Sequence, residues 1–157
     1  MSRKEDRECW LLGEFCKAMN KGGEPVFSFE CGEEGSSDGR LISGSRKIPI
    51  QIVTADGKIH QVVAVAQEKR EAIAFGIQTI EWIRCALERK VRKHYSDEKD
   101  LTILIECDLA AINSEYLVGE LRKDLGVQNS VRRFNGVYIL SPSRVENPKV
   151  GSPIVRL

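Results

Sequence analysis

The chain has 157 residues, of which 41% are hydrophobic and 30% are charged, a balance typical of one folded domain. Its formal net charge is +1, so the overall charge favours neither nucleic acid nor a membrane surface as a partner. No apolar run approaches the roughly 20 residues that cross a bilayer, and the N-terminal residues lack the apolar core of a secretory signal. We therefore expect a single domain over residues 1–157, located in the cytoplasm and without a membrane partner.

The cysteines and histidines do not form a metal-binding pattern. No C-x-x-C pair occurs among the five cysteines, and the two histidines, His60 and His94, lie far from each other and from any cysteine cluster. Zinc sites need closely spaced pairs of such ligands. We expect reduced and mostly buried thiols at positions 9, 16, 31, 85 and 107.

The first part of the chain is expected to form a helix followed by three strands. Apolar residues at positions 11, 12, 15, 16 and 19 recur at helical period and predict a helix over residues 4–20. Alternating or apolar runs then predict strands over residues 26–31, 41–42 and 48–55. Three strands with short links indicate an antiparallel meander. Residues 56–67 fit either a strand or the front of a helix, and both interpretations stay open.

Residues 68–95 carry the strongest periodic pattern. Apolar side chains recur every three or four positions from Ile73 to Val91, which predicts a long helix whose apolar face covers a sheet. The last turns of this helix are basic and contain Arg89, Lys90, Arg92 and Lys93. Cations at this place oppose the negative end of the helix dipole, and they also suit contacts with nucleic-acid phosphates.

The last part of the chain is expected to form a strand–helix–strand unit. Residues 101–107 are nearly all apolar, as in a strand buried on both faces. A helix is predicted from Asn113 to about Leu125, and a further strand over residues 137–140. Residues 143–157 contain two prolines and no clear period, so we expect a C-terminal arm. The predicted fold class is α/β, with a mixed sheet built from a helix, a three-strand meander, a helix and a strand, plus a further helix and strand.

Two polar residues of the meander stand out against this element order. Asp38 follows a turn rich in glycine and serine, and Gln51 interrupts the apolar third strand. With these residues, the segment from about Glu5 to Leu140 resembles the PD-(D/E)XK, or restriction-endonuclease-like, superfamily. The motif of that superfamily places an acidic residue near the start of the second strand, a second acid or a glutamine in the third strand, and a lysine two positions further on.

The resemblance implies a metal-dependent nuclease that hydrolyses the phosphodiester bonds of DNA or RNA. It assigns Mg²⁺ to the side chains of Asp38 and Gln51 and to the backbone carbonyl of Ile52, and hard cations do prefer such oxygen ligands. Residues two apart share one face of a strand, so the lysine of the family would stand at Val53. Valine can neither orient nor activate water, and this departure puts the activity in question.

Other residues must then complete the site. The nearest candidates in the sequence are two lysines, Lys47 and Lys69, and four acids on the first and the long helix, namely Glu8, Glu14, Glu68 and Glu71. We take Glu14 and Lys47, together with Asp38 and Gln51, as the candidate catalytic set. The basic end of the long helix is the candidate contact to nucleic acid.

Two further interpretations stay open. An aspartate followed by glycine often bonds the backbone of its own turn, and Gln51 also suits a solvent-facing position on a strand. The chain would then be a catalytically inactive member of the same fold, serving as a structural or interaction module, for example in a homodimer. Glu106 and Asp108 end the buried strand, at a place where open sheets bind small molecules.

Overall fold

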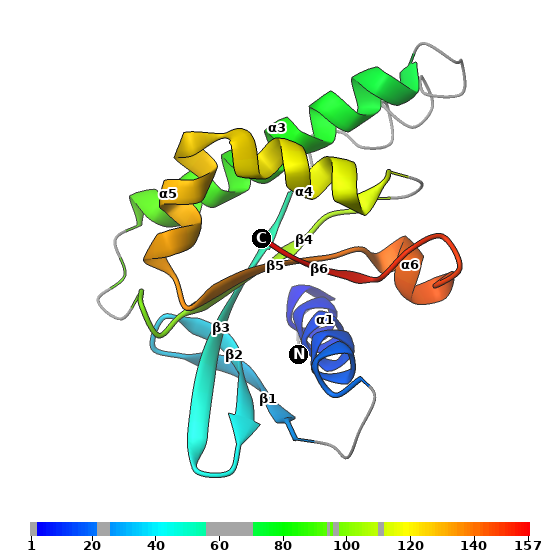
Figure 1. Ribbon diagram of the computed structural model, residues 1–157. Helices are drawn as coiled ribbons and strands as arrows, with labels where there is room; N and C mark the ends of the chain where they lie inside the picture. The colour runs from blue at the N-terminus through cyan, green and yellow to red at the C-terminus, as the bar shows by residue number, and fades with distance from the viewer. Residues whose placement is uncertain (1–2, 22–25, 56–70, 94, 96–97, 110–111) are drawn as a thin grey trace.

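The computed structural model describes residues 3–21, 26–55, 71–93, 95, 98–109 and 112–157. These residues form one six-stranded sheet in the order β1–β2–β3–β4–β5–β6, with helices on both faces (Figure 1). The strands are β1 (Ser28–Glu34), β2 (Ser37–Ser43), β3 (Arg46–Thr54), β4 (Thr102–Glu106), β5 (Gly136–Leu140) and β6 (Ile154–Arg156). The helices are α1 (Arg3–Met19), α3 (Glu71–Arg92), α4 (Ser114–Lys123), α5 (Leu125–Arg133) and α6 (Pro142–Glu146). The predicted α/β class with a mixed sheet is confirmed.

The sheet joins an antiparallel meander to a parallel unit. β1 pairs with β2 and β2 with β3 in the antiparallel sense, as predicted, whereas β3–β4 and β4–β5 are parallel pairs. The link between β1 and β2 is a tight turn at Gly35, whose φ of 59° favours glycine. Gly39 pairs with Ile50, so Ser37, the first residue of β2, lies level with Ile52. β3 continues to Thr54, and its end therefore extends beyond β2.

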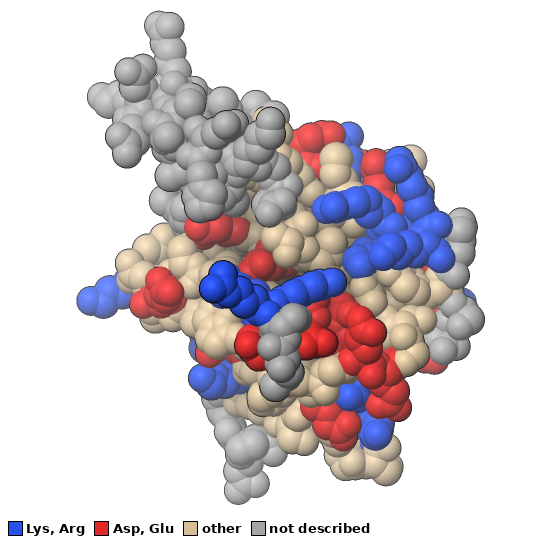
Figure 2. All heavy atoms as spheres, turned by 180° about the vertical axis from the view of Figure 1, so that it is seen from behind, with Lys and Arg blue, Asp and Glu red and all other residues tan. Residues whose placement is uncertain are grey.

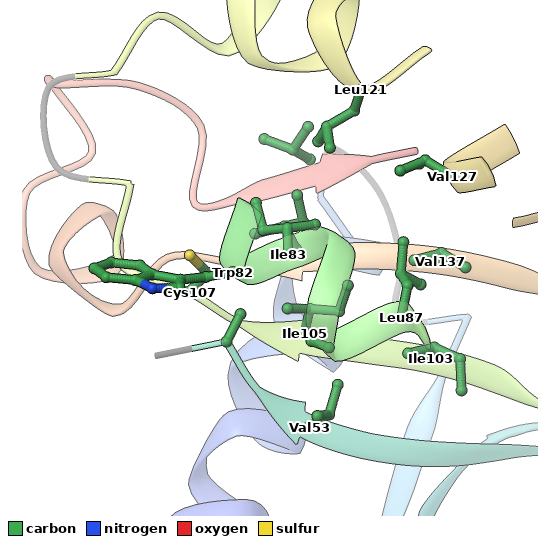
Figure 3. Packing of buried hydrophobic residues seen from close by; sticks show 14 of the residues in the cluster. Val53, Trp82, Ile83, Leu87, Ile103, Ile105, Cys107, Leu121, Val127 and Val137 are labelled. Atoms are coloured by element: carbon green, nitrogen blue, oxygen red, sulfur yellow. The ribbon is translucent and has the colours of Figure 1, made fainter. Parts of the chain in front are cut away.

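Alternation of side chains along β3 divides this strand between two cores. Ile50 and Ile52 belong to the core under α1. Val53 belongs to the core that α3, α4 and α5 form on the opposite face (Figure 3). Because successive side chains of a strand point to opposite faces, Gln51 shares the face of Val53. That face is the one that α3 covers.

The C-terminal part of the chain differs from the prediction in two places. The helix predicted from Asn113 breaks into α4 and α5, because Asp124 caps the second helix by accepting from the Val127 N–H at 3.2 Å. Residues 143–157, expected as an arm, contain most of α6 and all of β6, and β6 pairs with β5 at the edge of the sheet. The ambiguous residues 56–67 lie outside the described residues.

Arg144 anchors this C-terminal segment. Its side chain is 1% exposed and donates to Ser114 Oγ at 2.6 Å, to the Ser152 carbonyl at 3.3 Å and to the Ile112 carbonyl. These bonds tie α6 to the start of α4 and to the approach to β6. Of the helices that the structure describes, none is long and apolar enough to cross a membrane.

Candidate active site

Asp38 and Gln51 lie on neighbouring strands at the open end of the meander. Continuing the register of Gly39 opposite Ile50 by one residue places Asp38 level with Gln51. Asp38 Oδ2 accepts from the backbone N–H of Ile52 at 2.8 Å. Asp38 thus pairs a backbone N–H at the point where the hydrogen-bond ladder between β2 and β3 ends. This bond also holds the Asp38 carboxylate in place next to β3.

The Ile52 carbonyl points toward the same place. On a β-strand the N–H and the C=O of one residue project to the same side, and the Ile52 N–H bonds Asp38. The Ala55 N–H bonds the Glu106 carbonyl on the other side of β3, toward β4, in agreement with this alternation. Asp38, Gln51 and the Ile52 backbone thus occupy adjoining positions of β2 and β3, where the sequence predicts the site.

A lysine from α3 joins this group. Lys90 Nζ donates to Gln51 Oε1 at 2.5 Å, and Gln51 Nε2 donates to the Ser36 carbonyl at 2.5 Å. Both ends of the Gln51 amide are therefore engaged, and its oxygen faces an ammonium group. Gln51 thus suits the positioning of Lys90 better than the metal-ligand role that we expected for it.

The environment of Lys90 shifts its titration. The residue is 8% exposed, and burial, followed by the positive charge of Lys93, lowers its pKa from 10.5 to about 8, against the opposing effect of Asp38. Lys90 remains mostly charged at neutral pH but holds its proton less firmly than a solvated lysine. Lys90 is one of the four candidate contacts to nucleic acid at the basic end of α3. Its spacing from Ile83 and Leu87, seven and three positions earlier, instead puts it on the buried face of α3. This spacing is the signal in the sequence that identifies it.

Glu8 approaches Asp38 from the opposite face of the sheet. These two acids, with Lys4 and Glu33, line a hollow of about 330 Å³ between the start of α1 and the β1–β2 hairpin. The pKa of Glu8 is raised, first by burial and then by the negative charge of Asp38, while Lys4 lowers it. Two carboxylates that repel each other across one hollow favour a cation between them.

Tyr95 also lies within the field of Asp38. Its hydroxyl is buried and has no hydrogen-bond partner among the described residues. Burial and the negative charge of Asp38 raise the pKa of Tyr95. The ring lines a smaller hollow of about 230 Å³ with Ser36 and Ser37. The negative charge of Asp38 thus raises the pKa of Glu8 on α1 and of Tyr95 after α3, and it opposes the lowering of the pKa of Lys90 on α3.

The other candidates for the missing acid and lysine lie elsewhere. Glu14 Oε1 accepts from Lys17 at 3.1 Å and borders a different hollow with Arg144, so the structure does not bring it to Asp38. Lys47 is exposed and precedes Gln51 by four residues, about 13 Å along an extended strand. Residues 68 and 69 and the side chain at position 71 lie outside what the structure describes.

The basic end of α3 separates into two parts. Lys90 points inward, whereas Arg92 and Lys93 are exposed, and Arg92 forms a 3.8 Å ion pair with Glu88. Arg89 is exposed and donates to the Thr54 carbonyl at 3.2 Å, next to the end of β3. Figure 2 shows basic side chains gathered beside a band of acidic ones on one face of the molecule. The surface around the candidate site therefore carries both signs of charge.

The acids at the end of β4 have partners within the fold. Glu106 accepts from Arg7 at 2.8 Å and from Thr54 Oγ1 at 3.2 Å. Asp108 accepts from the hydroxyls of Ser141 and Ser143. These contacts link β4 to α1 and to the segment after β5, so the two acids serve to hold the ends of the strands.

The donor set at Asp38 fits a hard cation that keeps part of its water shell. Among the described residues, no three His, Cys, Asp or Glu side chains are grouped so that they could hold a metal ion. Four acidic residues, Glu5, Glu8, Glu33 and Asp38, line the hollow together with Lys4. The Ile52 carbonyl points to the side of Asp38. Mg²⁺ is commonly held by one or two carboxylates with waters and substrate phosphate oxygens. These carboxylates are the oxygen ligands that the hollow offers to such a cation, and Ile52 is not among the residues that line it.

A disulfide crosses the rim of the same hollow. Cys9 of α1 is bonded to Cys31 of β1, with Cα atoms 5.4 Å apart. The expectation that all five thiols are reduced is wrong for this pair. The remaining cysteines form no disulfide, and Cys16 and Cys107 are buried, as expected, whereas Cys85 is exposed.

Comparisons with protein-family models, with curated proteins and with solved structures gave no match. The function is therefore argued from the geometry of the site.

Proposed function

We propose that this chain is a metal-dependent phosphodiesterase of the restriction-endonuclease-like type, acting on DNA or RNA, in which a lysine from α3 takes the place of the lysine missing at Val53. The observation that carries the proposal is the 2.5 Å bond from Lys90 Nζ to Gln51 Oε1. This bond holds a buried ammonium group on the face of β3 where the side chain at position 53 also points, and the charge of Asp38 acts on it. A cation from α3 thus lies near the position where the strand carries Val53.

Each residue then has a distinct role. Asp38, Glu8 and the Ile52 carbonyl would hold Mg²⁺, which, when bound, supplies a Lewis acid for the phosphoryl group and a water of lowered pKa. Lys90, as an ammonium ion, stabilises the negative charge that develops on the phosphoryl oxygens. Gln51 positions Lys90, since its amide is fixed at the other end by the Ser36 carbonyl.

The surroundings supply contacts for a nucleic-acid backbone. Arg89, Arg92 and Lys93 lie on the helix end that follows or flanks Lys90 and are exposed. The β1–β2 hairpin carries Glu30, Glu33 and Glu34, and its acidic charge, which Arg40 offsets in part, disfavours phosphate. A substrate strand would therefore approach over the end of α3.

Cleavage assays with matched lysine variants test the proposal. The wild type should release acid-soluble nucleotide in Mg²⁺ or Mn²⁺, and Lys90→Met should reduce the rate by about 10² to 10⁴-fold, the range for loss of one charge-stabilising or proton-transferring group. Lys123→Met is the control, because Lys123 is exposed on α4 and pairs with Glu120 at 3.1 Å. Equal rates for the wild type, Lys90→Met and Asp38→Ala would refute the catalytic claim.

A second candidate function is a non-catalytic interaction module of the same fold. It is favoured because the Gln51 amide and the Asp38 carboxylate both make hydrogen bonds with other groups of the protein. This alternative predicts no Mg²⁺ binding by calorimetry and no steep loss of duplex affinity with salt. A homodimer would be the simplest such assembly, and light scattering measures it directly.

A further inference from the structure

The disulfide links α1, which carries Glu8, to β1, which pairs with the strand that carries Asp38. Cys9 follows Glu8 directly on α1, and Cys31 pairs with Gly39, the residue after Asp38. The bond thus bridges the helix that bears one acid to the strand that pairs beside the other. Both cysteines line the hollow of about 330 Å³ together with these acids.

The two halves of α1 are held to the sheet in different ways. Leu11, Leu12 and Phe15, in the second half, are buried in the core against β2 and β3. Residues 3–7 are exposed, and residues 8–10 are only partly buried. The links that join this first half to the sheet include the disulfide, the ion pair from Arg7 to Glu106 at 2.6 Å and the packing of Trp10 against the core. The disulfide is the covalent one, and it lies directly after Glu8.

The disulfide is placed where a small thiol can reach it. Cys9 and Cys31 are both partly exposed and border an open hollow, whereas a purely structural disulfide is usually enclosed by the core.

We propose that the Cys9–Cys31 disulfide is a reversible redox latch that closes the acidic hollow by holding the first half of α1 on the β1–β2 hairpin. A dithiol reduces it in two exchange steps. One thiolate of the dithiol attacks a sulfur of the disulfide, forms a mixed disulfide and releases the other cysteine as a thiolate, which takes up a proton. The second thiol of the dithiol then attacks the mixed disulfide and releases the remaining cysteine, so the dithiol leaves as its own disulfide with two electrons transferred to the protein.

Reduction frees the first half of α1 and moves Glu8 away from Asp38. The latch moves Glu8, a proposed Mg²⁺ ligand, but its tests measure thiol modification and hydrogen exchange and do not require phosphodiester hydrolysis. Its failure and the failure of the proposed function are therefore separate results.

Two measurements on the folded protein test the latch. The first treats native protein with dithiothreitol, alkylates it with iodoacetamide and maps the modified cysteines by mass spectrometry. The latch predicts that Cys9 and Cys31 are modified without denaturant and that reoxidation protects them again. Modification of this pair only after unfolding would overturn the proposal.

The second measurement is hydrogen–deuterium exchange of residues 3–9 before and after reduction. We expect exchange to become faster by about tenfold or more, with an upper limit of roughly 300-fold set by the loop-closure entropy of this bond. Cys85→Ser is the matched control, since it removes an exposed free thiol and should keep the full response. The double variant Cys9→Ser/Cys31→Ser should exchange fast at the start and not respond to dithiothreitol. Unchanged exchange of the wild type on reduction, or loss of the response in Cys85→Ser, would contradict the latch.

Discussion

Replacing Lys90 by methionine should change how the stability of the protein depends on pH. Burial lowers the pKa of Lys90 from 10.5 to about 8. Between these two pH values the unfolded chain binds the proton and the folded protein does not, so the stability of the wild type rises with pH across this window. Keeping Lys90 charged in the folded state therefore costs about 3 kcal/mol at neutral pH, because each unit by which its pKa is lowered corresponds to about 1.4 kcal/mol.

Methionine has a similar length and no charge, so Lys90→Met removes this dependence. The lost bond to Gln51 shifts the stability of the variant at every pH and leaves the slope unaffected. We expect the free energy of unfolding of the wild type, relative to Lys90→Met, to increase by about 2 to 3 kcal/mol between pH 7 and pH 10. Urea titrations followed by circular dichroism at several pH values measure this difference in the free energy of unfolding.

Lys123→Met supplies the control for that experiment. Lys123 is 76% exposed, so the difference between the wild type and this variant should stay constant over the same range of pH. A flat difference for Lys90→Met as well would refute the claim that a buried lysine with a lowered pKa faces Gln51.

Three further predictions concern the frame around the site. Gly39→Ala should destabilise the protein by about 1–3 kcal/mol in urea unfolding, because a Cβ at this position would lie 2.4 Å from a leucine methyl of α1, whereas Gly119→Ala meets no atom within 4 Å and should stabilise α4. A loss for both variants alike would contradict this packing. Arg144→Met should cost about 2–4 kcal/mol, since it removes a buried side chain's bonds to three acceptors, and an unchanged melting temperature would exclude that role. Reduction of the Cys9–Cys31 bond, which spans 22 residues, should lower the free energy of unfolding by about 3 kcal/mol, and identical urea curves with and without reductant would speak against it.

The sequence predicted the frame of the fold because that frame follows from local patterns. The apolar run of residues 101–107 and the period from Ile73 to Val91 identify β4 and α3, and alternation with turn residues identifies the meander. The break at Asp124 was not predicted, since an aspartate inside an apolar helical pattern can either continue the helix or cap the next one. β6 has only three residues and owes its existence to pairing with β5.

The candidate site could be predicted only in part. Asp38 and Gln51 face each other because of strand register, which short turns largely determine. Lys90 lies 39 positions after Gln51, and its role depends on how α3 lies across the sheet, which no local pattern encodes. The pairing of Cys9 with Cys31 likewise depends on the position of α1 against β1. Contacts between distant segments are therefore what sequence reasoning missed.

The pH dependence of cleavage tests the central claim most directly. Single-turnover rates of a labelled duplex in Mg²⁺ should fall as pH rises through about 8, because Lys90 acts as an ammonium ion and loses its proton there. Lys90→Met should be slow throughout and lack this transition. A wild-type profile that stays level across that pH, or one that Lys90→Met reproduces, would contradict the account.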